Sequence, residues 1–171
     1  MKLPQKKSVK NKGFTLLELI LVMIILCTVL GMASPSLRGF FSSRQLNDTA
    51  EQIIVLTRHA KTQAIYESKY YRIYFDLYNR QYWVSVLEES EFTPEQKLLA
   101  SRYTIPTDVK MTFENLLTEN NLYYIEYSPE GYTNRCRIIL EDNKKNIIEL
   151  TCLSPAENFE MAEILDGRIY Y

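Results

Sequence analysis

The stretch Lys12-Gly13-Phe14-Thr15-Leu16-Leu17-Glu18 opens an apolar run that extends to Ala33 and decides how the chain is organised. Of the 20 residues from Phe14 to Ala33, only Glu18 is charged. A helix of that length is about 30 Å long, which is enough to cross the hydrocarbon core of a bilayer. Five lysines and no acidic residue precede the run. This pattern predicts that the leader stays in the cytoplasm and that the rest of the chain is exported.

Glu18 is unusual for a membrane segment. An acidic residue at the centre of such a helix costs about 2.5–3.5 kcal/mol, and less near the interface. A secretory signal peptide gains nothing from this charge, because its apolar region is discarded. An ordinary signal peptide cut near Ala33-Ser34, or a plain anchor with a stray carboxylate, therefore leaves Glu18 unexplained.

The segment Gly13-Phe14-Thr15-Leu16-Leu17-Glu18 resembles the type III signal of type IV pilins and pseudopilins. The resemblance implies that a prepilin peptidase cuts between Gly13 and Phe14, that the new amino-terminal Phe14 is N-methylated, and that the helix is retained. It also implies that Glu18, as the fifth mature residue, attracts the terminal amine of a neighbouring subunit during assembly. A charge in lipid is tolerable when it meets an opposite charge there.

The exported part has room for one soluble domain of ordinary size. Without the leader, the chain has 15 basic and 21 acidic residues and a formal charge of −6, which argues against a basic surface that coats nucleic acid. The sequence has one histidine, His59, and no nucleophile motif, phosphate loop or metal-ligand spacing. We therefore expect no enzyme, no cofactor and no metal, and a solvated or capping role for His59.

The helix is expected to continue beyond the membrane. Pro35 predicts a kink, because proline removes one hydrogen bond and crowds the preceding turn. The resemblance implies a flexible segment there that lets the helix partly unwind in the fibre. The alternative is a proline at the membrane edge with no role in assembly. Farther on, apolar residues recur every three or four positions up to about Tyr66, which predicts an amphipathic helix packed on a sheet: Leu46, Ala50, Ile53, Leu56, Ala60 and Ala64.

From residue 69 the period of the apolar pattern changes to two, which predicts strands. Thr93-Pro94-Glu95-Gln96 has the pattern of a helix N-cap and predicts a short helical turn, whereas Glu114–Asn121 is expected to be a loop. A terminal hairpin is expected around Asp166-Gly167. The remaining strands are expected at Tyr71–Asp76, Gln81–Leu87, Ala100–Ile105, Val109–Phe113 and Leu122–Tyr127.

The apolar pattern of the expected strands Arg135–Glu141 and Ile147–Leu153 predicts how they pair. If the hairpin is symmetric about Lys144, the apolar residues of both strands face one side, as a half-buried sheet requires. The same register places Cys136 opposite Cys152, so a cross-strand disulfide is geometrically reachable in an exported domain. The alternative is two buried free thiols.

The order of these elements resembles the H-type minor pseudopilins of type II secretion and their pilus relatives, the GspH/FimT-like group. The implied fold class is α+β, with a long N-terminal helix followed by a small antiparallel β-sandwich. The implied domains are a leader at 1–13, a transmembrane assembly helix at 14–34, an amphipathic helix at 35–67 and a β-rich domain at 68–171. The segments that carry this finer resemblance are Ala33-Ser34-Pro35-Ser36-Leu37-Arg38, Ala60-Lys61-Thr62-Gln63-Ala64-Ile65, Arg72-Ile73-Tyr74-Phe75-Asp76 and Tyr127-Ser128-Pro129-Glu130-Gly131.

The resemblance implies a minor subunit of a type II secretion pseudopilus or a type IV pilus-like fibre, which contributes to fibre initiation or to the tip and supports protein secretion. Its expected partners are other pilins or pseudopilins, the prepilin peptidase and the inner membrane, with the C-terminal domain in the periplasm or outside.

The alternative is a DNA-binding minor pilin used in natural transformation. Some relatives carry a Gly-Arg-x-Arg motif in a C-terminal tail. The stretch Gly167-Arg168-Ile169-Tyr170 keeps only Arg168 of the two arginines. One arginine on an acidic domain makes too few phosphate contacts, so DNA is a disfavoured partner.

Overall fold

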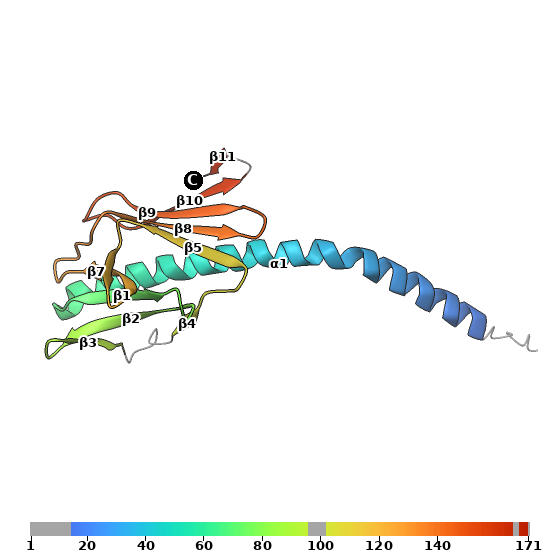
Figure 1. Cartoon of the computed structure of the whole chain (residues 1–171), viewed down its shortest axis with the longest axis horizontal. Coiled ribbons are helices and arrows are strands. Elements are labelled where there is room, and N and C mark those ends of the chain that lie inside the picture. The colour runs from blue at the N-terminus through green and yellow to red at the C-terminus, as the bar shows by residue number, and fades with distance from the viewer. Residues whose placement is uncertain (1–14, 96–101, 166–167, 171) are drawn as a thin grey trace, which may run out of the picture. The chain divides into compact units, whose positions relative to one another are not determined.

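The computed structural model describes residues 15–95, 102–165 and 168–170, except for the side chains of 32–42 and 165–170 (Figure 1). The chain divides into two compact units, residues 1–38 and 39–171, and each is described here by itself. Helix α1, Leu16–Glu67, belongs to both units and continues through Pro35. Because Pro35 lies close to the boundary between the units, the kink expected there stays a prediction.

In the second unit, α1 is amphipathic as expected. The six residues of the apolar stripe, from Leu46 to Ala64, are at most 1 % exposed and join a core that includes residues of both β-sheets. Arg44, Asp48 and Arg58 lie on the exposed face of the helix. Burial of this stripe against the sheets, more than intrinsic helix propensity, stabilises a helix of this kind.

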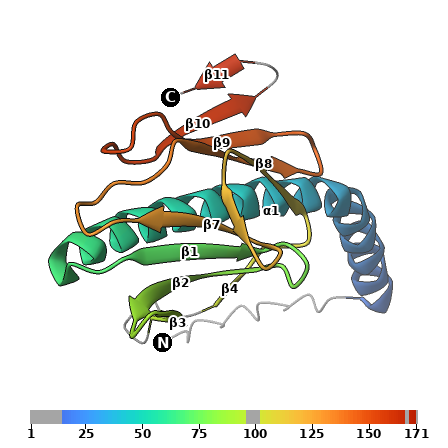
Figure 2. The same cartoon turned by 60° about the vertical axis from the view of Figure 1, so that its left-hand side comes forward.

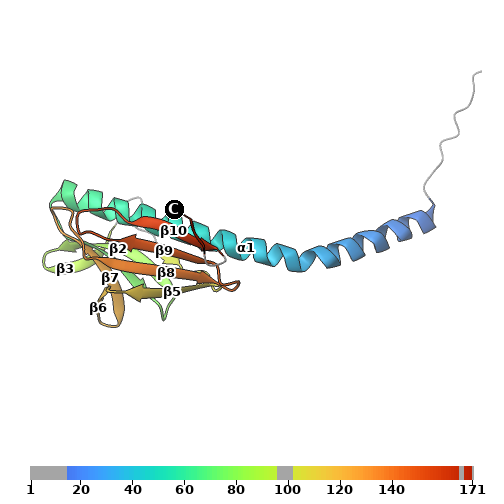
Figure 3. The same cartoon turned by 90° about the horizontal axis from the view of Figure 1, so that it is seen from above.

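The strands form two antiparallel sheets (Figure 2). Seen from above, the part of α1 that belongs to the second unit lies along one side of the strands (Figure 3). The first sheet has the order β3-β2-β1-β7-β6, with β4 also paired to β2: β1 Tyr71–Asp76, β2 Gln81–Glu88, β3 Glu91–Pro94, β4 Tyr103–Thr104, β6 Leu117–Glu119 and β7 Leu122–Tyr127. The second has the order β11-β10-β9-β8-β5: β5 Val109–Glu114, β8 Cys136–Asp142, β9 Ile147–Cys152, β10 Glu160–Leu165 and β11 Arg168–Tyr170.

The β8–β9 hairpin has the register that the sequence predicts. Its apolar pairs are all buried, as expected when one face of a hairpin meets the core. The terminal β10–β11 hairpin is also confirmed, while its turn residues Asp166 and Gly167 lie outside the described part of the chain. The buried pairs of the β8–β9 hairpin are Cys136 with Cys152, Ile138 with Leu150, and Leu140 with Ile148.

Two segments differ from the prediction. Pro94 is not the start of a helical turn but the last residue of β3, an edge strand, where a missing N–H is tolerated. The expected loop at Glu114–Asn121 contains the short strand β6. Asn120 and Asn121 connect β6 to β7 with φ angles of 50° and 64°, as the tight turns of β-hairpins require.

The turn of the β8–β9 hairpin is built on Asp142, whose side chain is buried. Its Oδ1 accepts hydrogen bonds from the main-chain N–H groups of Lys144 at 2.7 Å and Asn146 at 2.9 Å. Its Oδ2 accepts one from Ser43 of α1 at 3.4 Å. Because a buried carboxylate must be hydrogen-bonded, Asp142 fixes the turn and attaches it to the helix.

Near its other end, α1 is attached to the loop between β9 and β10 through Lys61. The Lys61 Nζ donates to the carbonyl oxygens of Ala156 at 2.6 Å and Glu157 at 3.2 Å, and to Asn158 Oδ1 at 3.1 Å. Hydrogen bonds to a charged donor are the stronger kind. The Lys61 ammonium group therefore ties the loop that leads into β10 to the helix.

We expect Gly131→Ala to lower the free energy of unfolding by about 1–3 kcal/mol, because Gly131 has a φ of 80° that side chains rarely adopt. A Cβ there would also lie 2.6 Å from Ile65 Cδ1 on α1. Urea unfolding of the purified chain measures the loss. Adding Ile65→Ala, at an exposed side chain, should restore only the steric part. An alanine variant as stable as the wild type would contradict this account.

Candidate functional site

The first turn of α1 is capped by Thr15. Its Oγ1 accepts a hydrogen bond from the Glu18 N–H at 3.3 Å, and its carbonyl oxygen accepts one from the Leu19 N–H at 3.2 Å. Thr15 is thus the N-cap, and Glu18 stands three residues later, the positions of a capping box. The pattern Thr-x-x-Glu in the sequence could have predicted that Thr15 caps the helix. The cleavage predicted between Gly13 and Phe14 lies outside the described residues and stays a prediction.

The apolar side chains that follow Thr15 are exposed. From Leu16 to Leu30, the large apolar residues are 43–78 % exposed. Cys27 lies among them as an exposed free thiol. In the part of the chain that the structure describes, no helix is long and apolar enough to cross a membrane.

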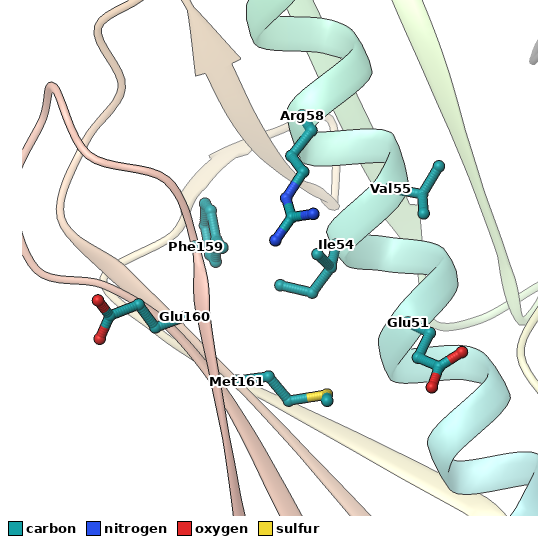
Figure 4. A pocket seen from close by; sticks show the side chains of 7 residues that line it. All are labelled: Glu51, Ile54, Val55, Arg58, Phe159, Glu160 and Met161. Atoms are coloured by element: carbon teal, nitrogen blue, oxygen red, sulfur yellow. The ribbon is translucent and has the colours of Figure 1, made fainter. Parts of the chain in front are cut away.

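The globular unit carries an open groove between α1 and the start of β10 (Figure 4). Its volume is about 590 Å³. Ile54 and Phe159 are buried residues at its base, whereas Val55 and Met161 are 51 % and 42 % exposed. Two carboxylates and one guanidinium complete the lining, from Glu51, Arg58 and Glu160. The groove joins residues about a hundred positions apart in the sequence.

His59 is neither solvated nor a helix cap, so that prediction is wrong. Its Nε2 lies 2.9 Å from Glu95 Oε2, and the side chains of His59 and Glu95 are only 18 % and 2 % exposed. A buried carboxylate needs a hydrogen-bonding partner, and His59 on α1 provides it. Sequence reasoning missed the pair because it placed Glu95 in a helical turn rather than directly after β3.

The two cysteines of the β8–β9 hairpin are buried free thiols that lie opposite each other in register. Burial raises the pKa of the Cys136 thiol to about 12, with a smaller contribution from Cys152, whose own pKa burial also raises. Because the thiolate is the reactive form, we expect both thiols to react slowly once the domain is folded. The disulfide stays a prediction.

We expect that the exported protein carries a Cys136–Cys152 disulfide formed before folding is complete. Its mass without reductant should be lower by two hydrogens than the reduced mass. Reduced folded protein should react with a small aromatic disulfide far more slowly than the same protein in urea. A Cys136→Ser variant is the matched control. Two free thiols in protein isolated from the export compartment would contradict the prediction.

Arg168, the residue with a predicted weak DNA contact, begins β11 and pairs with Leu165 of β10. Its side chain lies outside the described residues. Residues 14–171 contain 15 basic and 21 acidic residues, so this arginine belongs to an acidic part of the chain. The structure therefore adds no support to the DNA-binding alternative.

The amino-terminal segment matches a known protein family. Residues 9–34 match the family model described as the prokaryotic N-terminal methylation motif, a range that includes Gly13, Phe14 and Glu18. Comparison with the sequences of curated proteins finds no match.

The fold is similar to that of the minor pseudopilin EpsH from the type 2 secretion system of Vibrio cholerae, with a TM-score of 0.58 and 11 % identity over 72 % of this chain and 99 % of that one. The fold of the chain is pilin-like. A second structure of EpsH gives a TM-score of 0.51 with 9 % identity over 74 % and 92 % of the two chains. The Pseudomonas aeruginosa type IV minor pilin FimU gives 0.47 with 10 % identity over 70 % and 96 %.

The expected α+β class is confirmed, because the pilin-like chain has an N-terminal helix followed by antiparallel sheets. The matched methylation motif, residues 9–34, contains the residues predicted for processing and assembly: Gly13, Phe14 and Glu18.

Proposed function

We propose that this pilin-like chain is a minor subunit of a type II secretion pseudopilus or a related type IV pilus fibre, where it contributes to initiation or to the tip. The observation that carries the proposal is the position of Glu18. It is the one charge in an apolar run, it stands in the first turn of α1, and it lies within the matched methylation motif.

Processing and assembly are chemically linked in this proposal. Cleavage between Gly13 and Phe14 creates a new amine at Phe14, and a monomethylated amine still carries a positive charge. In a subunit bundle, that amine and the Glu18 carboxylate of a neighbour neutralise each other in a medium where an isolated charge is costly. The exposed apolar side chains between Leu16 and Leu30 supply the packing surface for neighbouring helices or for lipid.

The proposal includes a membrane-anchored precursor. Residues 1–13 are the leader, and 14–34 form the membrane helix with the lysine-rich leader on the cytoplasmic side. The helix continues through 35–67, and the β-rich domain at 68–171 lies in the periplasm or outside. Prepilin peptidase and other pilin-like subunits are the partners.

Fibre incorporation tests the proposal directly. The full chain is produced in a bacterium that contains a prepilin peptidase and the chain's own fibre genes, and sheared fibres are separated from membranes. We expect the mature chain in the fibre fraction, with a methylated Phe14 at its amino terminus by mass spectrometry. Mature chain that stays in the membrane while the other subunits form fibres would overturn the proposal.

The same strain separates secretion from DNA uptake. The acidic balance of the mature chain favours secretion. Deleting the gene should therefore leave a secreted protein in the periplasm, with transformation unchanged. Loss of transformation with normal secretion would instead support the DNA-binding alternative.

A further inference from the structure

Two turns lie at the end of the domain where α1 enters it, one between β1 and β2 and one between β8 and β9 (Figure 2). We call their exposed residues, 77–79 and 143–145, the base. In the first turn, Leu77 is 39 % and Tyr78 is 94 % exposed. In the second, Lys144 and Lys145 are exposed. The base therefore presents an aromatic ring and two ammonium groups at one end of the domain.

The two turns of the base are connected to each other and to α1. Arg80, in the first turn, donates a hydrogen bond to the carbonyl oxygen of Val109 at 2.9 Å. Val109 pairs with Asp142, whose carboxylate fixes the second turn. Asp142 also accepts the hydrogen bond from Ser43. The base is thus attached to α1 at residue 43, and its turns are held together.

The base is positively charged. Its six residues include two lysines and no acidic residue. The carboxylates at the starts of the two turns are bound within them, because Asp142 is buried and Asp76 accepts hydrogen bonds from the N–H and Nδ2 of Asn79 at 2.9 and 2.7 Å. Neither lysine forms an ion pair with another residue that the structure describes. Two free ammonium groups favour an anionic partner.

The helix limits how far the base can lie from a bilayer. The apolar run ends at Ala33, and Ser43 is ten residues farther along the same helix. Ten residues of α-helix measure about 15 Å, and a bend can only shorten this distance. The headgroup layer is about 5–8 Å thick on each side of the hydrocarbon core. When residues 14–34 span the membrane, the attachment point of the base is therefore within about 10 Å of the headgroups, or about one Debye length at 0.1 M salt.

We propose that the base binds the anionic headgroups of the bilayer that holds the chain's own helix, before the subunit enters a fibre. The inference rests on the proposed function, because residues 14–34 must span the membrane. Lys144 and Lys145 pair with lipid phosphate groups. Tyr78 lies at the level of the headgroups, where a ring that is apolar at one end and polar at the other is favoured. Entry into a fibre then requires release of these contacts.

Quenching of a fluorophore by lipid tests the contact in the full chain, reconstituted into vesicles. A small fluorescent amino acid replaces Tyr78 or, in the control, Tyr66, which is 83 % exposed near the end of α1. Some lipid headgroups carry a nitroxide quencher. In vesicles of equal parts phosphatidylglycerol and phosphatidylcholine, we expect much stronger quenching at position 78 than at position 66. The difference should disappear in phosphatidylcholine alone and at high salt. Equal quenching at both positions, or the same difference without anionic lipid, would overturn the inference.

Charge variants measure the contribution of the lysines. Lys144→Glu and Lys145→Glu should each lower the ratio of bound to unbound base at least fivefold, the effect of losing one lysine at an anionic surface. Arg135→Glu, which reverses an exposed charge just before the other end of β8, is the matched control and should leave the ratio unchanged. Asp108→Asn removes a partly exposed carboxylate next to Val109 and should raise the ratio. If both lysine variants behaved like the control, the inference would be wrong.

Flotation of the vesicles separates the inference from the proposed function. If the wild-type chain is washed off the vesicles at alkaline pH, the membrane anchor of the proposed function is wrong, and the inference with it. If the chain floats with the vesicles while position 78 is quenched no more than position 66, the base does not bind lipid and the proposed function stands.

Discussion

A Gly13→Leu variant should retain residues 1–13, so that no new amino terminus forms at Phe14. The predicted cut follows Gly13, where the lack of a Cβ lets a peptidase approach the main chain closely. Without the cut there is no free amine beside the apolar run to pair with Glu18. We therefore expect complete loss of cleavage, and with it loss of fibre incorporation, while the uncut chain still reaches the membrane.

The intact mass of the protein in the membrane fraction shows whether this variant retains residues 1–13. Ser8→Leu is the matched control, because it adds the same side chain to the leader away from the cut. The control should be processed like the wild type. If the Gly13→Leu chain were still cut after residue 13, Gly13 would not be required for processing.

A Glu18→Gln variant should insert into the membrane normally and yet enter fibres at least tenfold less, a difference of about 1.4 kcal/mol. Glutamine keeps a side-chain oxygen in the first turn, so the local capping of α1 is preserved. Only the negative charge is lost, so the positively charged amino terminus of a neighbouring subunit has no carboxylate to pair with in the bundle. The amount of mature chain in sheared fibres measures the effect.

Thr15→Val is the matched control for Glu18, because Thr15 Oγ1 accepts the hydrogen bond from the Glu18 N–H. The valine has the same shape without the acceptor and should weaken the helix start by about 1 kcal/mol. We expect it to retain most fibre incorporation. If Glu18→Gln behaved like the wild type and Thr15→Val did not, the helix cap rather than the charge would be the essential function of this turn.

The fold could be predicted where local pattern and register agree. The β8–β9 hairpin has alternating apolar residues on both strands, and one choice of register buries them all. By contrast, β6 has three exposed residues and gives no alternation, so only its Asn120-Asn121 turn was a usable signal. At β3, Thr93 and Pro94 have the local chemistry of a helix start, and pairing with β2 overrides it.

The residues proposed for processing and assembly could be selected from the sequence because their chemistry is local. Glu18 stands out as a lone charge in an apolar run, whatever the rest of the chain does. The groove is different, since Val55 on α1 and Met161 on β10 come together only through the packing of the second sheet on the helix. The His59–Glu95 pair has the same origin, and no spacing in the sequence connects its two members.

The two polar attachments of α1, at Ser43 and at Lys61, have a mechanical consequence. They are 18 residues apart, or about 27 Å along the helix. Both join the helix to loops of the second sheet, Ser43 to the β8–β9 turn and Lys61 to the β9–β10 loop. Traction along the helix axis therefore stretches both attachments and shears the apolar contacts between them at the same time, instead of peeling the sheet away bond by bond. A domain tied in this way follows its helix under load.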